Sequence, residues 1–99
     1  AAAVIIGASL ETHLKKMCLK NDIAIDETTL NGKTRTKKAD TLNAELAQKE
    51  IYLKLDQKYI TAWLGLRNSA AHGDYGKYTK EQVQLMLNGV REFIARFPS

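Results

Sequence analysis

The sequence has little of what a disulfide-linked or turn-rich fold requires. Its single cysteine, Cys18, rules out a disulfide within the chain. A lone cysteine is typical of a reducing compartment, so we expect the protein to be cytoplasmic. One proline and six glycines in 99 residues leave few breaks for a β architecture with many turns. The remaining composition, 44% hydrophobic and 26% charged, is ordinary for a globular chain.

Long hydrophobic runs are also missing. The apolar start, residues 1–10, is too short to span a bilayer and lacks the basic leader of a signal peptide. No membrane association is therefore expected. The chain opens inside an apolar pattern without an initiator methionine. We interpret residues 1–99 as one domain, large enough for one modest core, and as the C-terminal fragment of a longer protein.

The spacing of apolar residues predicts an all-α bundle of about four helices with short connections. The expected helices cover residues 2–20, 39–49, 57–71 and 79–97. The third should begin after Asp56 as its N-cap and stop at Gly73. The fourth begins with a capping-box pattern, in which Thr79 precedes Gln82 at the third helical position. The alternation of apolar residues over 51–55 predicts an extended connector before the third helix.

The segment 23–38 is predicted to be a loop that turns at Asn31-Gly32. Its last six residues carry four positive charges: Lys33, Arg35, Lys37 and Lys38. These residues form either a solvated, mobile loop or an arm that binds phosphates. The net charge of +4 and the pI near 9.3 suit a polyanionic partner but do not require one. Near Lys77, Tyr75 and Tyr78 either stack on nucleic-acid bases or cover the loop between helices.

The third helix carries a charge where a core residue is expected. Arg67 falls within the stripe formed by Ile60, Trp63 and Leu64. Because an unpaired buried charge is costly, Arg67 should behave in one of three ways. It pairs with an acid such as Glu11, or it extends past the helix end. Otherwise, its side of the helix faces a cleft or a subunit interface.

A second strip on the same helix contains Gly65, Asn68 and His72. A glycine in mid-helix costs ~1 kcal/mol relative to alanine and indicates that another backbone comes close. Asn68 and His72 are four residues apart, so the amide is placed to orient the imidazole, or the pair simply closes the helix end. Arg67 and His72 lie about 140° apart around the axis. In a dimer with twofold symmetry, Arg67 of one copy and His72 of the other could reach the same atom of a substrate.

Other side chains give no sign of a cofactor or metal. The sequence has no zinc-ligand spacing, no phosphate-binding glycine loop and no carboxylate pair. Cys18 is interpreted as a packing residue because no second cysteine or nearby histidine completes a site. His13 is interpreted as lying at the core edge or on the surface. We therefore predict neither a metal nor a cofactor.

The segment from Leu66 to Gly73, Leu-Arg-Asn-Ser-Ala-Ala-His-Gly, resembles the signature of HEPN domains. That signature is an arginine, an adjacent polar residue, three variable residues and a histidine near a helix end. The helix order also fits, with a long opening helix containing Leu10-Glu11 and an amphipathic closing helix. The resemblance implies a HEPN-like bundle that dimerises through the motif helix. It also implies metal-independent RNA cleavage in toxin, phage-defence or RNA-processing systems.

By the same resemblance, each motif residue has an expected role. Arg67 would stabilise charge on the scissile phosphate, His72 would act as general acid or base, and Asn68 would orient His72. The RNA 2′-hydroxyl would attack, leaving a cyclic phosphate and a 5′-hydroxyl. The implied partners are RNA, a second copy, and an antitoxin or upstream domain. The alternative is a non-catalytic dimerisation or regulatory module of a larger protein.

Overall fold

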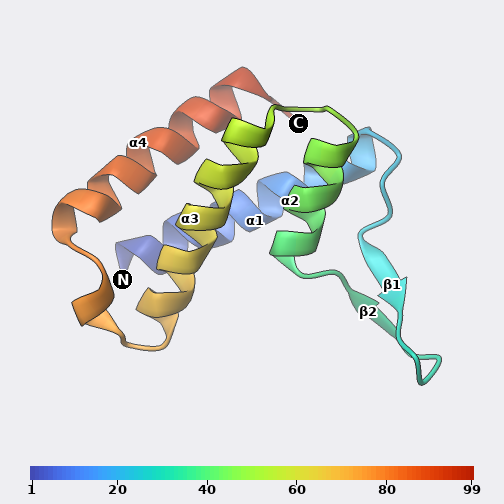
Figure 1. Cartoon of the computed structure of the whole chain (residues 1–99), viewed down its shortest axis with the longest axis horizontal. Helices are drawn as coiled ribbons and strands as arrows, with labels where there is room; N and C mark the ends of the chain where they lie inside the picture. The colour runs from blue at the N-terminus through green and yellow to red at the C-terminus, as the bar shows by residue number, and fades with distance from the viewer.

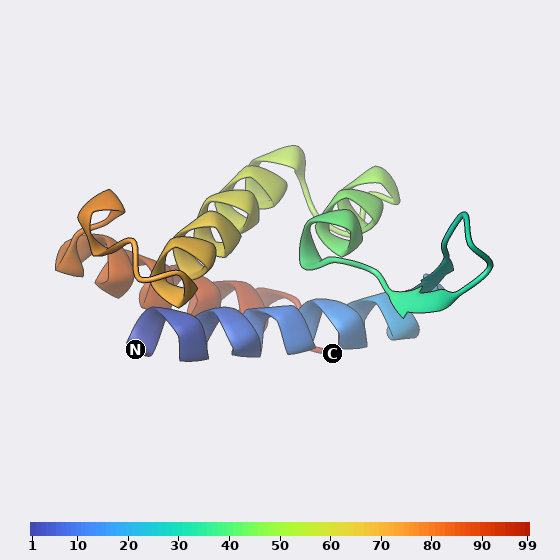
Figure 2. The same ribbon diagram turned by 90° about the horizontal axis from the view of Figure 1, so that it is seen from below.

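Four α-helices form two layers in the computed structural model, which describes residues 1–99 (Figure 1). The elements are α1 (Ala2–Lys20), β1 (Asp26–Thr28), β2 (Thr34–Thr36), α2 (Ala39–Gln48), α3 (Lys54–Ala71), the 3-10 turn η1 (Tyr75–Lys77) and α4 (Lys80–Arg96). Figure 2 shows α1 and α4 in one layer, with α2 and α3 crossing them in the other. The predicted helical bundle is confirmed, with a small hairpin added. None of the helices is long and apolar enough to cross a membrane.

The core lies where α1 meets the other three helices. Leu10 and Leu14 of α1 are completely buried there. The ring of Phe93 from α4 is 1% exposed and packs edge-to-face on Tyr52, with centroids 5.4 Å apart. His13 also packs edge-to-face on Phe93. These contacts place α1 at the centre of the bundle, because it packs closely against each of the other three helices.

A buried polar network fixes α2 against α3. The Tyr52 hydroxyl donates to Asn43 Oδ1 at 2.6 Å, and Asn43 Nδ2 donates to the Gln57 carbonyl at 3.0 Å. Burial, with smaller contributions from Cys18 and Asp56, raises the pKa of Tyr52 well above its usual range. The hydroxyl therefore stays protonated as a donor. This network holds the middle of α2 beside the first half of α3.

Three helices end in the same backbone arrangement. The residue after each C-cap is left-handed, with φ of 60° at Asp22, 61° at Glu50 and 75° at Gly73. At the end of α3, the Asp74 N–H donates to the Ser69 carbonyl at 2.8 Å, as in a Schellman motif. The predicted stop at Gly73 is confirmed. This arrangement fixes the position of the final turn of α3, which carries the motif.

The expected cap at Asp56 is wrong by three positions. α3 begins at Lys54, and the Asp56 carboxylate accepts the backbone N–H of Leu53 at 3.1 Å. The other carboxylate oxygen accepts from the Arg96 guanidinium at 2.7 Å. Asp56 thus closes the start of α3 and joins it to the end of α4. The extended connector consequently ends at Leu53.

The predicted loop at 23–38 is also wrong, because β1 and β2 form an antiparallel hairpin. Glu27 lies opposite Arg35, and their side chains form an ion pair of 2.7 Å. The turn at Asn31-Gly32 was correctly located, with Gly32 at φ 78°. Both strands contain only Asp, Glu, Thr and Arg, so no apolar alternation marks them. The hairpin projects from the bundle (Figure 1). Leu30, in the turn between its strands, is fully exposed.

Candidate functional site

The motif residues lie in the last turns of α3, beside α1 and the start of α2. A small cavity of about 220 Å³ opens here. Its lining comes from three helices and consists of Glu11, Lys38, Ala39, Asp40, Leu64, Arg67 and Asn68. The two acidic and two basic side chains balance in charge, so the cavity as a whole does not favour one sign.

Arg67 runs from the α1–α3 contact into this cavity. Its Nη2 lies 3.5 Å from Glu11 Oε2, and its Nη1 donates to Asn68 Oδ1 at 3.5 Å. The side chain is 32% exposed, while Nε is buried without a hydrogen-bond partner. Two of the three expected behaviours therefore occur together, because Arg67 pairs with Glu11 and faces a cleft. Both contacts are long, so the guanidinium retains donor capacity for a ligand.

His72 is the C-cap residue of α3, and its side chain is exposed. Its Nδ1 lies 2.8 Å from the backbone carbonyl oxygen of Asn68. A carbonyl only accepts hydrogen bonds, so we assign the proton to Nδ1. In the neutral ring, Nε2 then carries the free lone pair and faces solvent. A ring held through one nitrogen with the other free is suited to proton transfer.

Asn68 contacts both residues, but differently from the prediction. Its backbone carbonyl orients His72, whereas its side-chain amide contacts Arg67. Any residue at this position could supply the carbonyl, so the amide itself is not what holds the imidazole. No hydrogen bond joins Arg67 to His72 within the chain. The two expected catalytic groups thus occupy neighbouring but separate positions at one helix end.

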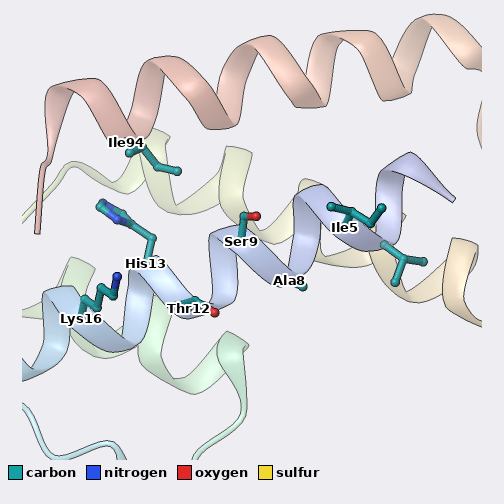
Figure 3. Close-up of a pocket in the computed structure, with 8 residues that line it drawn as sticks. Ile5, Ala8, Ser9, Thr12, His13, Lys16 and Ile94 are labelled. Atoms are coloured by element: carbon teal, nitrogen blue, oxygen red, sulfur yellow. The ribbon is translucent and has the colours of Figure 1, made fainter.

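The other histidine serves packing. His13 is 7% exposed, and its Nε2 donates to the Phe97 carbonyl at 2.6 Å. Figure 3 shows the ring near Ile94, at one end of a shallow cavity on the outer side of α1. Lys16 of the same helix also lines this cavity. His13 therefore lies at the core edge, as the sequence suggested.

Only part of the predicted basic set is free to bind phosphate. Arg35 is paired with Glu27, and Lys37 with Glu45 at 2.9 Å. Lys33 and Lys38 make no ion pair. Lys38 is the one member of the predicted basic set that shares the cavity of Arg67 and Asn68. Lys77 lines a different cavity, between α3 and α4.

An apolar groove between α3 and α4 was not anticipated from the sequence. Two adjoining cavities share Tyr59, Trp63 and Leu85 as lining. Tyr59 is 54% exposed and Leu85 is 68% exposed. A second stripe on α3 would have revealed this groove: Leu55, Tyr59, Ala62 and Leu66.

Gly65 lines the same groove, and beyond its chain neighbours and the adjacent backbone of α3, no atom lies within 4 Å of the Cβ position it lacks. The expectation that another backbone comes close to Gly65 is therefore wrong within the chain. The backbone of α3 is instead accessible from outside at this point.

Comparisons with protein-family models, with curated proteins and with solved structures found no match for this chain. The geometry around Arg67, Asn68 and His72 is therefore the basis for the function proposed below. No group of three or more His, Cys, Asp or Glu side chains lies together in an arrangement that could hold a metal ion.

Proposed function

We propose that the chain is a HEPN-type endoribonuclease that cleaves RNA without a metal ion. The observation that carries this proposal is the state of His72, exposed at the end of α3 and held through Nδ1 by the Asn68 carbonyl. Arg67 supports it, because its guanidinium reaches a cleft beside the same helix end. The context implied by the resemblance is a cytoplasmic toxin, phage-defence or RNA-processing system.

The chemistry requires two functions from these residues. His72 Nε2 removes the proton from the RNA 2′-hydroxyl, whose oxygen bonds to phosphorus as the bond to the 5′-oxygen breaks. The imidazolium then supplies a proton to that departing oxygen. Arg67 binds the phosphate oxygens as negative charge develops, and Lys38 adds positive charge at the cavity edge. General acid–base help contributes about 10²–10⁴-fold, and fixed charge stabilisation about 10²–10³-fold.

The separation of Arg67 from His72 favours a site shared by two copies. Within one chain, Arg67 is directed toward Glu11 of α1, whereas His72 lies exposed at the helix end. The uncovered α3 stripe supplies an apolar surface on the motif helix. We therefore propose a homodimer that packs through α3 and brings Arg67 of one protomer near His72 of its partner.

The accessible backbone at Gly65 gives a direct test of this dimer. In a monomer, Gly65→Ala should stabilise α3 by up to ~1 kcal/mol, because alanine has the higher helix propensity and no atom opposes the methyl. In a dimer that packs closely on α3, the methyl should instead weaken association. We expect light scattering to give twice 11.1 kDa for the natural chain and a concentration-dependent lower mass for Gly65→Ala.

The control for this experiment is Gln84→Ala, which changes an exposed residue of α4 outside the cavities at α3. It should leave the dimer mass unchanged. If the natural chain is monomeric at every concentration, the shared site is wrong. If Gly65→Ala is dimeric and more stable, the interface lies elsewhere.

The proposed reaction is tested by incubating the protein with RNA and with DNA of the same sequence in EDTA. RNA should be cut to products with a cyclic phosphate and a 5′-hydroxyl, since the nucleophile belongs to the substrate. DNA should remain intact because it lacks the 2′-hydroxyl. Mass spectrometry of the product ends distinguishes this chemistry from hydrolysis. Equal cleavage of RNA and DNA would exclude the proposal.

A second function, a non-catalytic dimerisation or regulatory module, is favoured by the α3–α4 groove. Its exposed apolar side chains form a surface of the kind that receives another protein. Under this alternative, the groove would bind an antitoxin or an upstream domain, and Arg67–Glu11 would be a structural pair. Intact RNA after incubation with a folded, dimeric protein would favour this function.

A further inference from the structure

Gly7 of α1 meets the side chain of Arg67 where α1 crosses α3. A Cβ on Gly7 would lie 2.2 Å from Arg67 Cγ and 2.6 Å from Arg67 Cβ. Side-chain atoms do not approach this closely, and Gly7 is buried, so a methyl group here has no space. Only glycine allows the arginine stem to pass between the two helices.

The same stretch of α1 also contacts the far end of Arg67. Glu11 follows Gly7 by four residues, one turn along the helix, and its carboxylate lies 3.5 Å from Arg67 Nη2. The stem is thus confined at Gly7 and the guanidinium is attracted at Glu11. With two such restraints, the guanidinium is directed into the cavity that it shares with Lys38 and Asn68.

We propose that Gly7 is a positioning residue for the ribonuclease reaction, because its missing side chain forms a slot that sets where the Arg67 guanidinium stands. The catalytic consequence rests on the proposed function, whereas the slot is a property of the fold and can be tested without RNA. A methyl at Gly7 would displace Arg67 by ~1 Å, and a misplacement of that size can cost ~10²-fold in rate.

A matched control exists on α4. A Cβ on Gly89 would lie 2.3 Å from Trp63 Cζ2, so Gly89→Ala creates a clash similar in size to that of Gly7→Ala. Gly89 contacts the apolar ring of Trp63 and does not line the cavity of Arg67. Comparing the two substitutions separates general damage to the bundle from displacement of Arg67.

Thermal unfolding tests the slot itself. Gly7→Ala should lower the Tm by roughly 5–20 °C, the range expected for overpacking a small domain. Adding Arg67→Ala should restore part of this loss, because it removes the Cγ that makes the closest contact. Losses that simply add in the double variant would overturn the proposal. If Gly7→Ala does not fold, the double variant Gly7→Ala with Arg67→Gly should fold. A double variant that also fails to fold would overturn the proposal.

RNA cleavage tests the positioning role under conditions where every variant is folded. In single-turnover assays, Gly7→Ala should lose ~10²-fold in cleavage rate, with RNA binding within a few-fold of the natural chain. Gly89→Ala should keep its rate at concentrations where light scattering gives the mass of the natural chain, and Gly7→Ala should add no further loss to Arg67→Ala. Equal losses for Gly7→Ala and Gly89→Ala would show a merely structural role. If the natural chain cleaves no RNA, the ribonuclease proposal fails, while the unfolding experiment still decides the slot.

Discussion

Replacing His72 with alanine is expected to lower the rate of RNA cleavage by about 10²–10⁴-fold, the usual contribution of a general acid or base. The substitution removes the only exposed imidazole of the chain. It should leave stability almost unchanged, because the His72 side chain makes one hydrogen bond, at the surface, to the Asn68 carbonyl. RNA binding should also persist, since the phosphate contacts assigned to Arg67 and Lys38 remain.

The measurement is a single-turnover cleavage rate together with an RNA dissociation constant for each variant. His13→Gln is the matched control, because it changes the other histidine, which is buried against Phe97 and Phe93. That variant should lose stability and retain cleavage wherever it is folded. Full activity in His72→Ala would remove the ribonuclease proposal and leave the assembly module as the better explanation.

Phe93→Ala should produce the largest loss of stability, about 3–5 kcal/mol in the free energy of unfolding. Its ring is 1% exposed and contacts the rings of His13, Tyr52 and Phe97. These partners come from α1, from the segment before α3 and from the end of α4. The bundle cannot close the resulting cavity without moving α4 on α1.

Urea unfolding followed by circular dichroism gives this free energy. Leu85→Ala is the control, because Leu85 is also on α4 but is 68% exposed. It should change the stability of the chain by no more than ~0.5 kcal/mol. Similar losses for the two variants would mean that Phe93 is not the packing centre described here.

The helices were predictable where side chains report directly on the backbone. Thr79 and Gln82 exchange the hydrogen bonds expected of a capping box, with the Gln82 N–H donating at 3.2 Å and the Thr79 N–H at 2.7 Å. Asp56 was misassigned because a carboxylate satisfies free N–H groups equally well as the cap or from the third position. The sequence correctly predicted that the Asp56 carboxylate accepts a backbone N–H at the start of α3. Whether Asp56 is the cap or the third helical residue depends on the conformation of the residues that precede it.

The helix positions of the motif residues were predictable, but most of their contacts were not. Periodicity located Arg67 on a core stripe and suggested Glu11 as its partner, as the structure shows. It could not show that Gly7 forms the slot, because that contact depends on where α1 crosses α3. Nor could it separate Lys38, beside the motif, from Lys37, which pairs with Glu45. Contacts between helices depend on the angle at which the helices cross, and this angle cannot be read from the residue pattern of either helix alone.

The pairing of α1 with α4 has a consequence for biosynthesis. α1 is synthesised before α4, against which it packs, and the hydrogen bond from His13 to Phe97 spans 84 positions. At ~5–20 residues per second, roughly 4–17 s separate the synthesis of these two residues. During that interval, Leu10 and Leu14 lack the cover of α4 and present an apolar helix face to the cell. We therefore expect the nascent chain to bind chaperones until α4 has been made.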